Sequence, residues 1–141
     1  MRPVDGTSLR LGHVGDARDR AGLHAAGIEA VVDLADNEPP VGHARSVVAL
    51  RFPLLDGEGN PPWLLRLAVE AVAALIRADV PALVHCSAGQ SRPPAVIAAA
   101  LAVARGLAPD AALRLVTRAG PADVSPALWA DLRAVVAADA G

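Results

Sequence analysis

The chain has one cysteine, no tyrosine and no lysine, and its thirteen arginines and fifteen acidic residues leave a net charge of only −2. A single cysteine cannot form an internal disulfide, so a hydrophobic core must hold the fold. With 141 residues the chain can bury about two thirds of its unfolded surface in such a core. The small net charge excludes a general attraction to nucleic acid or anionic lipid, and we expect neither as a partner.

Long hydrophobic runs are also missing. The longest apolar run, residues 93–104, is too short to cross a bilayer, and the amino terminus lacks the apolar stretch of a secretory signal. The sequence shows no internal repeat, linker or low-complexity tail. We therefore expect one cytoplasmic domain over residues 1–141.

Apolar periodicity predicts strands that alternate with helices. Compact β-branched or apolar segments predict strands at residues 9–12, 28–34, 46–52 and 82–85, the third of them broken at Pro53. Helical spacing predicts helices at residues 17–26, 63–79, 92–105, 109–118 and 126–138, with Gly27 ending the first and Ser125 capping the last. This alternation predicts an α/β domain with a mostly parallel central sheet of about four to five strands flanked by helices.

The cysteine lies in a short loop between a strand and a helix. Cys86 ends an apolar strand and Arg92 opens a helix six positions later, so the residues between them must curl at the carboxyl end of the strand, where open α/β sheets bind ligands. Such a loop can turn its amide N–H groups toward a tetrahedral oxyanion. The loop consists of Ser87, Ala88, Gly89, Gln90 and Ser91.

Three residues of this strand–loop–helix segment suit phosphate chemistry. Gly89 permits a tight turn, and the guanidinium of Arg92 can donate to two phosphate oxygens. Cys86 would face the phosphorus as a nucleophile. A helix terminus stabilises a thiolate by about 0.3–2 kcal/mol. A guanidinium about 4 Å away adds roughly 4 kcal/mol at an effective dielectric of about 20, before desolvation is subtracted. The neighbours of this cysteine therefore favour a reactive thiolate over an inert core thiol.

Residues 85–92 resemble the His-Cys-five-residues-Arg signature of the protein tyrosine phosphatase superfamily, and the whole chain is most similar to a small dual-specificity phosphatase. Residues 9–35 are similar to the opening strand, helix and strand of those enzymes, and residues 52–60 lie where they carry the general-acid loop. The resemblance implies hydrolysis of phosphomonoesters through a cysteinyl-phosphate on Cys86. It implies no metal or organic cofactor, because arginine and backbone amides neutralise the phosphate.

The resemblance also assigns the proton transfers. It implies that Asp56 protonates the departing alcohol and then activates the water that frees the enzyme, with Glu58 as the reserve candidate. His85 is expected to support the loop by a hydrogen bond, with its side chain on the opposite face of the strand from Cys86.

Pro93 departs from the family pattern. The family usually has Ser or Thr directly after the arginine, with a hydroxyl that stabilises the sulfur as it leaves the phosphoenzyme. Slow turnover is therefore expected unless Ser87 or Ser91 substitutes. Gln90 is also unusual at its position, where it either orients a water molecule or lines the rim.

A second departure concerns the brace of the signature loop. The family often braces this loop with an Asn from a late loop of the chain. Here the late segment RAGPADVSP offers only Ser125 and Asp123 nearby. The sequence therefore leaves open what holds the signature loop in place.

Two other functions are open at this point. A rhodanese-type sulfurtransferase carries a persulfide on a comparable cysteine loop, but His85, Gly89 and Asp56 argue against it. A domain that binds phosphorylated groups without efficient release is consistent with Pro93. Asp56 also lies in an Asp-Gly pair, which is an ordinary turn sequence.

The remaining polar and aromatic residues have simple structural interpretations. Three histidines lack the spacing of a metal site and are expected to be solvated or core residues: His13, His24 and His43. Three acidic residues after the second strand either edge the pocket or form a solvated turn, and the turn is the simpler interpretation: Asp33, Asp36 and Glu38. Trp63 and Trp129 are expected to anchor the core.

Few aromatic residues are available to wall a deep pocket, namely Phe52, Trp63 and Trp129. We therefore expect a shallow site that admits phosphoserine, phosphothreonine and phosphotyrosine in a protein, or a small phosphomonoester. The neutral loop without lysine argues against highly charged inositol phosphates.

Overall fold

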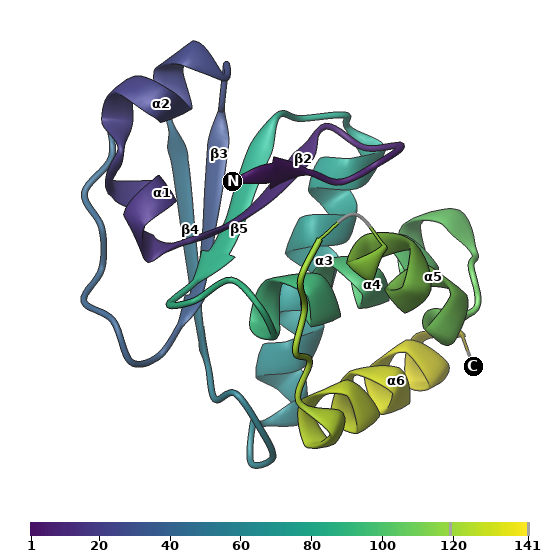
Figure 1. The fold of residues 1–141 in the computed structure, drawn as a ribbon. Coiled ribbons are helices and arrows are strands. Elements are labelled where there is room, and N and C mark those ends of the chain that lie inside the picture. Colours follow the sequence, from purple (N-terminus) through teal and green to yellow (C-terminus); the bar gives the residue numbers. More distant parts are fainter. Residues whose placement is uncertain (119, 141) are drawn as a thin grey trace.

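The computed structural model describes residues 1–118 and 120–140. A five-stranded sheet with the strand order β1-β2-β5-β3-β4 forms its centre (Figure 1). The strands are β1 (Arg2–Pro3), β2 (Leu9–His13), β3 (Ala30–Ala35), β4 (Val48–Leu54) and β5 (Ala82–Cys86). β1 pairs antiparallel with β2, and the other pairings of the described strands are parallel. The expected α/β fold with a mostly parallel sheet is confirmed.

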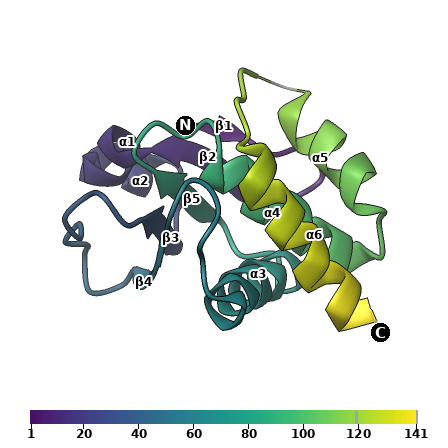
Figure 2. The same ribbon diagram turned by 90° about the horizontal axis from the view of Figure 1, so that it is seen from below.

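Helices cover both faces of the sheet. One face carries α1 (Val14–Arg18) and α2 (Arg20–Ala25), and the other carries α3 (Pro62–Arg77) and α4 (Arg92–Arg105). The last helices, α5 (Pro109–Thr117) and α6 (Pro126–Ala140), pack on the outer side of α4 (Figure 2). Within the described residues, no helix is long and apolar enough to cross a membrane.

The central helix α4 fixes the position of Arg92. All of its residues from Arg92 to Ala102 are buried, as its nearly unbroken run of Ala, Val, Ile and Leu requires. Gly106 ends the helix in the left-handed conformation with φ +66°. Because α4 lies between the sheet and helices α5 and α6, with α3 beside it, its first residue is held beside the end of β5.

The register of the sheet brings the ends of three strands to one edge. β5 lies between β2 and β3, with His13 opposite Cys86 and Asp33 opposite His85. The loops that follow these parallel strands therefore emerge at the same edge of the sheet. Side chains alternate along β5, so His85 shares the face of Leu83 toward α1 and α2, and Cys86 points to the opposite face.

Two predicted boundaries are wrong, and one short strand was missed. The helix expected at residues 17–26 is divided at Asp19, whose backbone is not helical and whose side chain accepts the Gly22 N–H to begin α2. The strand expected to break at Pro53 continues to Leu54, because β4 is an edge strand on which the missing proline N–H needs no partner. The two-residue strand β1 was not predicted.

The two tryptophans differ in their environment. Trp129 is buried in the core and its Nε1–H donates to Asp110 Oδ1 at 3.1 Å, which confirms its expected role. Trp63 is 61% exposed, so its assignment to the core is wrong. The core face of α3 is made by Leu65 and the apolar residues that follow it at helical spacing, and Trp63 lies off that face.

Candidate active site

The signature loop, residues 87–91, joins β5 to α4 and folds around the sulfur of Cys86. The Gly89 N–H donates to Cys86 Sγ at 3.2 Å and directs its partial positive charge at the sulfur. Gly89 has φ +77°, and a Cβ added there would lie 2.6 Å from the carbonyl oxygen of Gly12. Only glycine fits this turn, because the loop rests directly on the backbone of β2.

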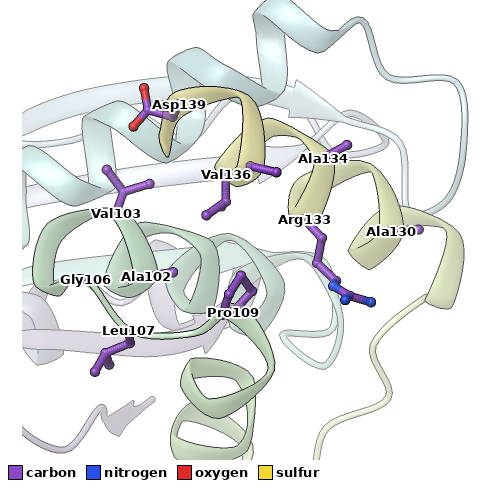
Figure 3. A pocket seen from close by; sticks show the side chains of 11 residues that line it. Ala102, Val103, Gly106, Leu107, Pro109, Ala130, Arg133, Ala134, Val136 and Asp139 are labelled. Carbon is purple, nitrogen blue, oxygen red and sulfur yellow. The ribbon is translucent and has the colours of Figure 1, made fainter. Parts of the chain in front are cut away.

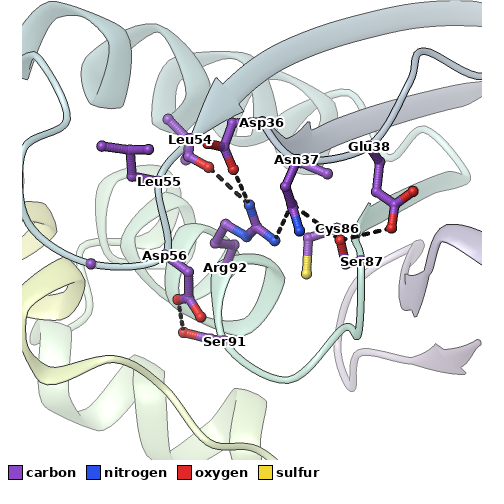
Figure 4. A network of polar contacts seen from close by, with 12 residues as sticks. Asp36, Asn37, Glu38, Leu54, Leu55, Asp56, Cys86, Ser87, Ser91 and Arg92 are labelled. Carbon is purple, nitrogen blue, oxygen red and sulfur yellow. Dashed lines mark hydrogen bonds and ion pairs between the residues drawn. The ribbon is translucent and has the colours of Figure 1, made fainter.

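Arg92 reaches the same place from the first turn of α4. Its Nη1 donates to Asp36 Oδ1 and to the carbonyl oxygen of Leu54, each at 2.9 Å. Its Nη2 donates to Asn37 Oδ1 at 3.0 Å (Figure 4). Its Nε is buried and has no hydrogen-bond partner among the described residues. Three of the five guanidinium N–H groups are therefore committed.

Two N–H groups of Arg92 remain available to an anion. They are the Nε–H and the second N–H of Nη2, which lie along one edge of the planar guanidinium. That edge matches two oxygens of a phosphate in a bidentate pair. A buried donor without a partner costs about 1–3 kcal/mol, so a bound oxyanion also removes an existing penalty.

The turn at residues 36–38 ties both ends of the signature loop together. Asn37 Oδ1 accepts from Arg92 and also from Ser87 Oγ, the latter at 3.1 Å. Glu38 Oε1 also lies 3.1 Å from the Ser87 hydroxyl, whose single proton is shared between the two acceptors. The expected turn is confirmed for Asp36 and Glu38, which lie in a bend at the surface, and it is wrong for Asp33, which is buried within β3. The contacts of Asp36 and Glu38 with α4 and the signature loop are not visible in the local sequence.

Asp56 approaches the signature loop from the segment after β4. Its Oδ1 accepts a hydrogen bond from Ser91 Oγ at 2.5 Å. The segment is closed by the buried side chain of Asn60, whose Oδ1 accepts the Leu55 N–H at 2.8 Å and whose Nδ2 donates to the Leu55 carbonyl at 2.9 Å. Glu58 is exposed and lies outside the described residues that line the pocket.

The late segment braces the loop through its main chain. The Asp123 N–H donates to the Gln90 carbonyl at 2.8 Å, and the Ser125 N–H donates to Ser91 Oγ at 2.9 Å. Both residues named from the sequence take part, but with backbone groups in place of side chains. Ser125 Oγ itself accepts the Leu128 N–H at 3.4 Å and caps α6 as predicted.

A pocket of about 150 Å³ opens between these segments. None of its described lining residues is aromatic, and they include both ends of the signature segment and the acidic candidate: Asp56, Cys86, Ser87, Ala88, Gln90, Ser91, Arg92 and Asp123. A larger cavity of about 720 Å³ lies between the α4–α5 corner and α6, as Figure 3 shows. Its lining is mostly alanine and valine, and none of its described residues is a nucleophile.

His85 lies beneath the loop on the far side of β5. It is fully buried, and its Nδ1 lies 3.4 Å from the carbonyl oxygen of Cys86. Burial lowers the pKa of His85, although the nearby Asp33 carboxylate opposes the shift, so the imidazole is neutral near pH 7. This position suits a structural support of the cysteine strand.

The other histidines do not converge. His13 Nδ1 accepts the Gly15 and Asp16 N–H groups and caps α1. His24 is exposed, and His43 lies on a small pocket near Asp33. Among the residues that the structure describes, no group of three or more His, Cys, Asp or Glu side chains could hold a metal ion.

Comparison with known proteins shows the family of the chain. Residues 11–106 match the family model described as "Polymorphic toxin system, DSP-PTPase phosphatase". The chain belongs to this dual-specificity phosphatase family. The matched range contains the cysteine loop, Arg92 and Asp56. No curated protein matches the chain in a sequence comparison.

Solved structures of dual-specificity phosphatases share the whole fold. The chain is 30% identical to human DUSP28 over 96% of this chain and 95% of that one, with a TM-score of 0.82. It is also 30% identical to a mouse putative dual specificity phosphatase, crystallised with zinc tungstate, over 93% and 83% of the two chains with a TM-score of 0.81.

A third structure, the human tyrosine phosphatase-like serine/threonine/tyrosine-interacting protein, is 18% identical over 95% and 94% of the two chains, with a TM-score of 0.80, and shares the fold. Family membership and the similarity to DUSP28 together show that the chain is a phosphatase of the dual-specificity type.

Proposed function

We propose that Cys86, Arg92 and Asp56 carry the phosphatase reaction of this chain. The observation that supports the proposal most directly is the unpartnered, buried Nε–H of Arg92, a residue that lines the same pocket as Cys86 and Asp56. Three residues from three separate segments converge there on a volume that suits one phosphoryl group.

The reaction has two displacements at phosphorus. The Cys86 thiolate forms an S–P bond as the bond between phosphorus and the ester oxygen breaks, and protonated Asp56 gives its proton to that oxygen. Water then attacks the phosphocysteine, the Asp56 carboxylate accepts a proton from it, and the S–P bond breaks to return the thiolate. The Nε–H and Nη2–H of Arg92 and the amides of residues 87–91 neutralise the equatorial oxygens throughout.

The substrate class follows from the shape of the pocket. A pocket of about 150 Å³ with no aromatic wall among its described residues accepts a phosphoryl group close to the surface. We infer that the protein removes phosphate from exposed serine, threonine and tyrosine side chains or from small phosphomonoesters. The Asp123 carboxylate on the pocket disfavours polyphosphorylated substrates.

The test is hydrolysis of p-nitrophenyl phosphate and phenyl phosphate by three forms of the chain. Cys86→Ser is expected to lose all release. Asp56→Asn is expected to lose far more activity with phenyl phosphate than with p-nitrophenyl phosphate, because the poorer leaving group depends more on the acid. Equal losses on the two esters would remove Asp56 from the proposal. Cyanide-dependent turnover of thiosulfate in place of ester hydrolysis would favour the sulfurtransferase.

A second candidate function, phosphate capture with slow release, has one specific observation in its favour. The hydroxyl groups of Ser87 and Ser91 are bound to the 36–38 turn and to Asp56 respectively, and neither has a hydrogen bond to Cys86 Sγ. Among the described residues, the Gly89 N–H is the group that donates a hydrogen bond to the sulfur. Neither serine replaces the hydroxyl that Pro93 removes.

A further inference from the structure

Ser91 occupies a helix N-cap position but makes no capping bond. It is the residue before α4, and its side chain has no hydrogen bond to the helix backbone. An N-cap serine normally accepts the N–H of the second or third helical residue, which here are Pro93 and Pro94. Proline has no N–H, so the sequence removes both usual donors. The hydroxyl of Ser91 is thus free to bind groups outside the helix.

The two partners of this hydroxyl come from the other two loops of the site. The Ser125 N–H donates to Ser91 Oγ at 2.9 Å, and Ser91 Oγ donates to Asp56 Oδ1 at 2.5 Å. Ser91 is only 6% exposed, whereas Asp56 is exposed to solvent apart from this contact. Figure 4 shows the Asp56 side chain directed at Ser91 on the side of the pocket away from Asp36 and Asn37.

A serine hydroxyl has one proton and two lone pairs, and here one lone pair receives the Ser125 N–H. The hydroxyl donates its proton to Asp56 Oδ1. Because Oδ1 faces Ser91, Oδ2 is the oxygen that can exchange a proton with the substrate. The contact with Ser91 thus fixes the orientation of the carboxyl group.

We propose that Ser91 is the positioning residue of the general acid, holding Asp56 so that Oδ2 delivers and later accepts the proton. This inference rests on the proposed role of Asp56. It also explains why Ser91 cannot replace the hydroxyl that is missing at position 93, since its single proton is already donated. Pro93 thus takes the place of a hydroxyl that would donate to the sulfur. Pro93 and Pro94 together leave the Ser91 hydroxyl free to bind Asp56.

The test compares phenyl phosphate with p-nitrophenyl phosphate in Ser91→Ala. Loss of an orienting hydrogen bond to a charged group is expected to lower kcat/KM for phenyl phosphate by about tenfold or more, with a much smaller loss for p-nitrophenyl phosphate. Ser91→Thr keeps the hydroxyl and is expected to restore the ratio of the two rates. In the Asp56→Asn background, Ser91→Ala is expected to leave that ratio unchanged.

Ser87→Ala is the matched control, because it removes the other loop hydroxyl, whose partners are Asn37 and Glu38 and not the acid. It is expected to lower both rates by the same factor. Vanadate affinity within about twofold of the parent shows that the Ser91→Ala loop is intact. If Asp56→Asn changes the ratio of the two rates and Ser91→Ala does not, the positioning role is wrong and the proposed function stands. If Asp56→Asn does not change it, the assignment of the acid fails.

Discussion

Restoring a hydroxyl at position 93 provides a quantitative test of how the phosphoenzyme breaks down. Pro93 is the second residue of α4, directly after Arg92, and resemblance to the family places a sulfur-stabilising hydroxyl there. Within the described part of the chain, Cys86 Sγ receives the Gly89 N–H and no hydroxyl. The departing thiolate therefore lacks one hydrogen bond, and we expect the phosphocysteine to accumulate.

The missing hydrogen bond sets the size of the effect. A hydrogen bond to a charged group is worth about 1.5–3 kcal/mol. Because about 1.36 kcal/mol in a barrier is a tenfold change in rate, Pro93→Ser should speed phosphoenzyme hydrolysis by about 10–150-fold. Formation of the phosphoenzyme does not require this hydroxyl, so kcat should rise while kcat/KM stays the same.

Rapid mixing with p-nitrophenyl phosphate measures both steps. The parent chain should release one equivalent of nitrophenol in a burst and then turn over slowly, and Pro93→Ser should show a smaller burst with a faster steady state. Pro93→Ala is the control, since it restores the backbone N–H without a hydroxyl. The absence of a burst in the parent, or an equal gain in Pro93→Ala, would refute this reasoning.

Three further predictions concern the support of the loop. Gly89→Ala should lower the free energy of unfolding by about 2 kcal/mol or more, because alanine is strained in the left-handed conformation and its Cβ would meet the Gly12 carbonyl. Gly57→Ala is the control and should leave the free energy of unfolding unchanged, because a Cβ there meets nothing within 4 Å. Burial holds the pKa of His85 below its ordinary value of about 6.5. As the pH falls, the unfolded chain therefore takes up this proton before the folded chain does. The free energy of unfolding should then decrease below about pH 6.5. His85→Gln should reduce this pH dependence of the free energy of unfolding, measured by denaturant titration. The same pH dependence in His85→Gln and in the parent would contradict the prediction. Asn37→Ala removes the acceptor of the Arg92 Nη2 hydrogen bond and should raise the Kd for vanadate about tenfold. An unaltered Kd would show that the 36–38 turn does not position the guanidinium.

The features that were predicted correctly are those encoded in a continuous stretch of sequence. The cysteine strand, the small loop and the alanine-rich helix form one segment, so Cys86, Gly89 and Arg92 could be placed from their spacing. Asp56 could be named as a candidate acid because the family resemblance points to its segment, and the structure places it on the pocket that Cys86 lines.

The missed features depend on contacts between distant segments. Asp36 and Asn37 bind Arg92 because β3 and β5 are neighbours in the sheet, a pairing that the local pattern does not specify. The brace from residues 123–125 uses backbone N–H groups, which every residue except proline has, so no side-chain type marks it. Asn60 had a visible signal, since an asparagine between a Gly-rich turn and two prolines is well suited to close a loop.

The direct test of the whole account is the covalent state of Cys86 during turnover. The chain is mixed with p-nitrophenyl phosphate, quenched in acid within the first turnover and digested, and the peptide that contains Cys86 is weighed by mass spectrometry. We expect one phosphoryl group on Cys86, absent without substrate and absent in Cys86→Ser. Ester hydrolysis at the parent rate by Cys86→Ser, or turnover with an unmodified Cys86 at every quench time, would contradict the central role of this cysteine.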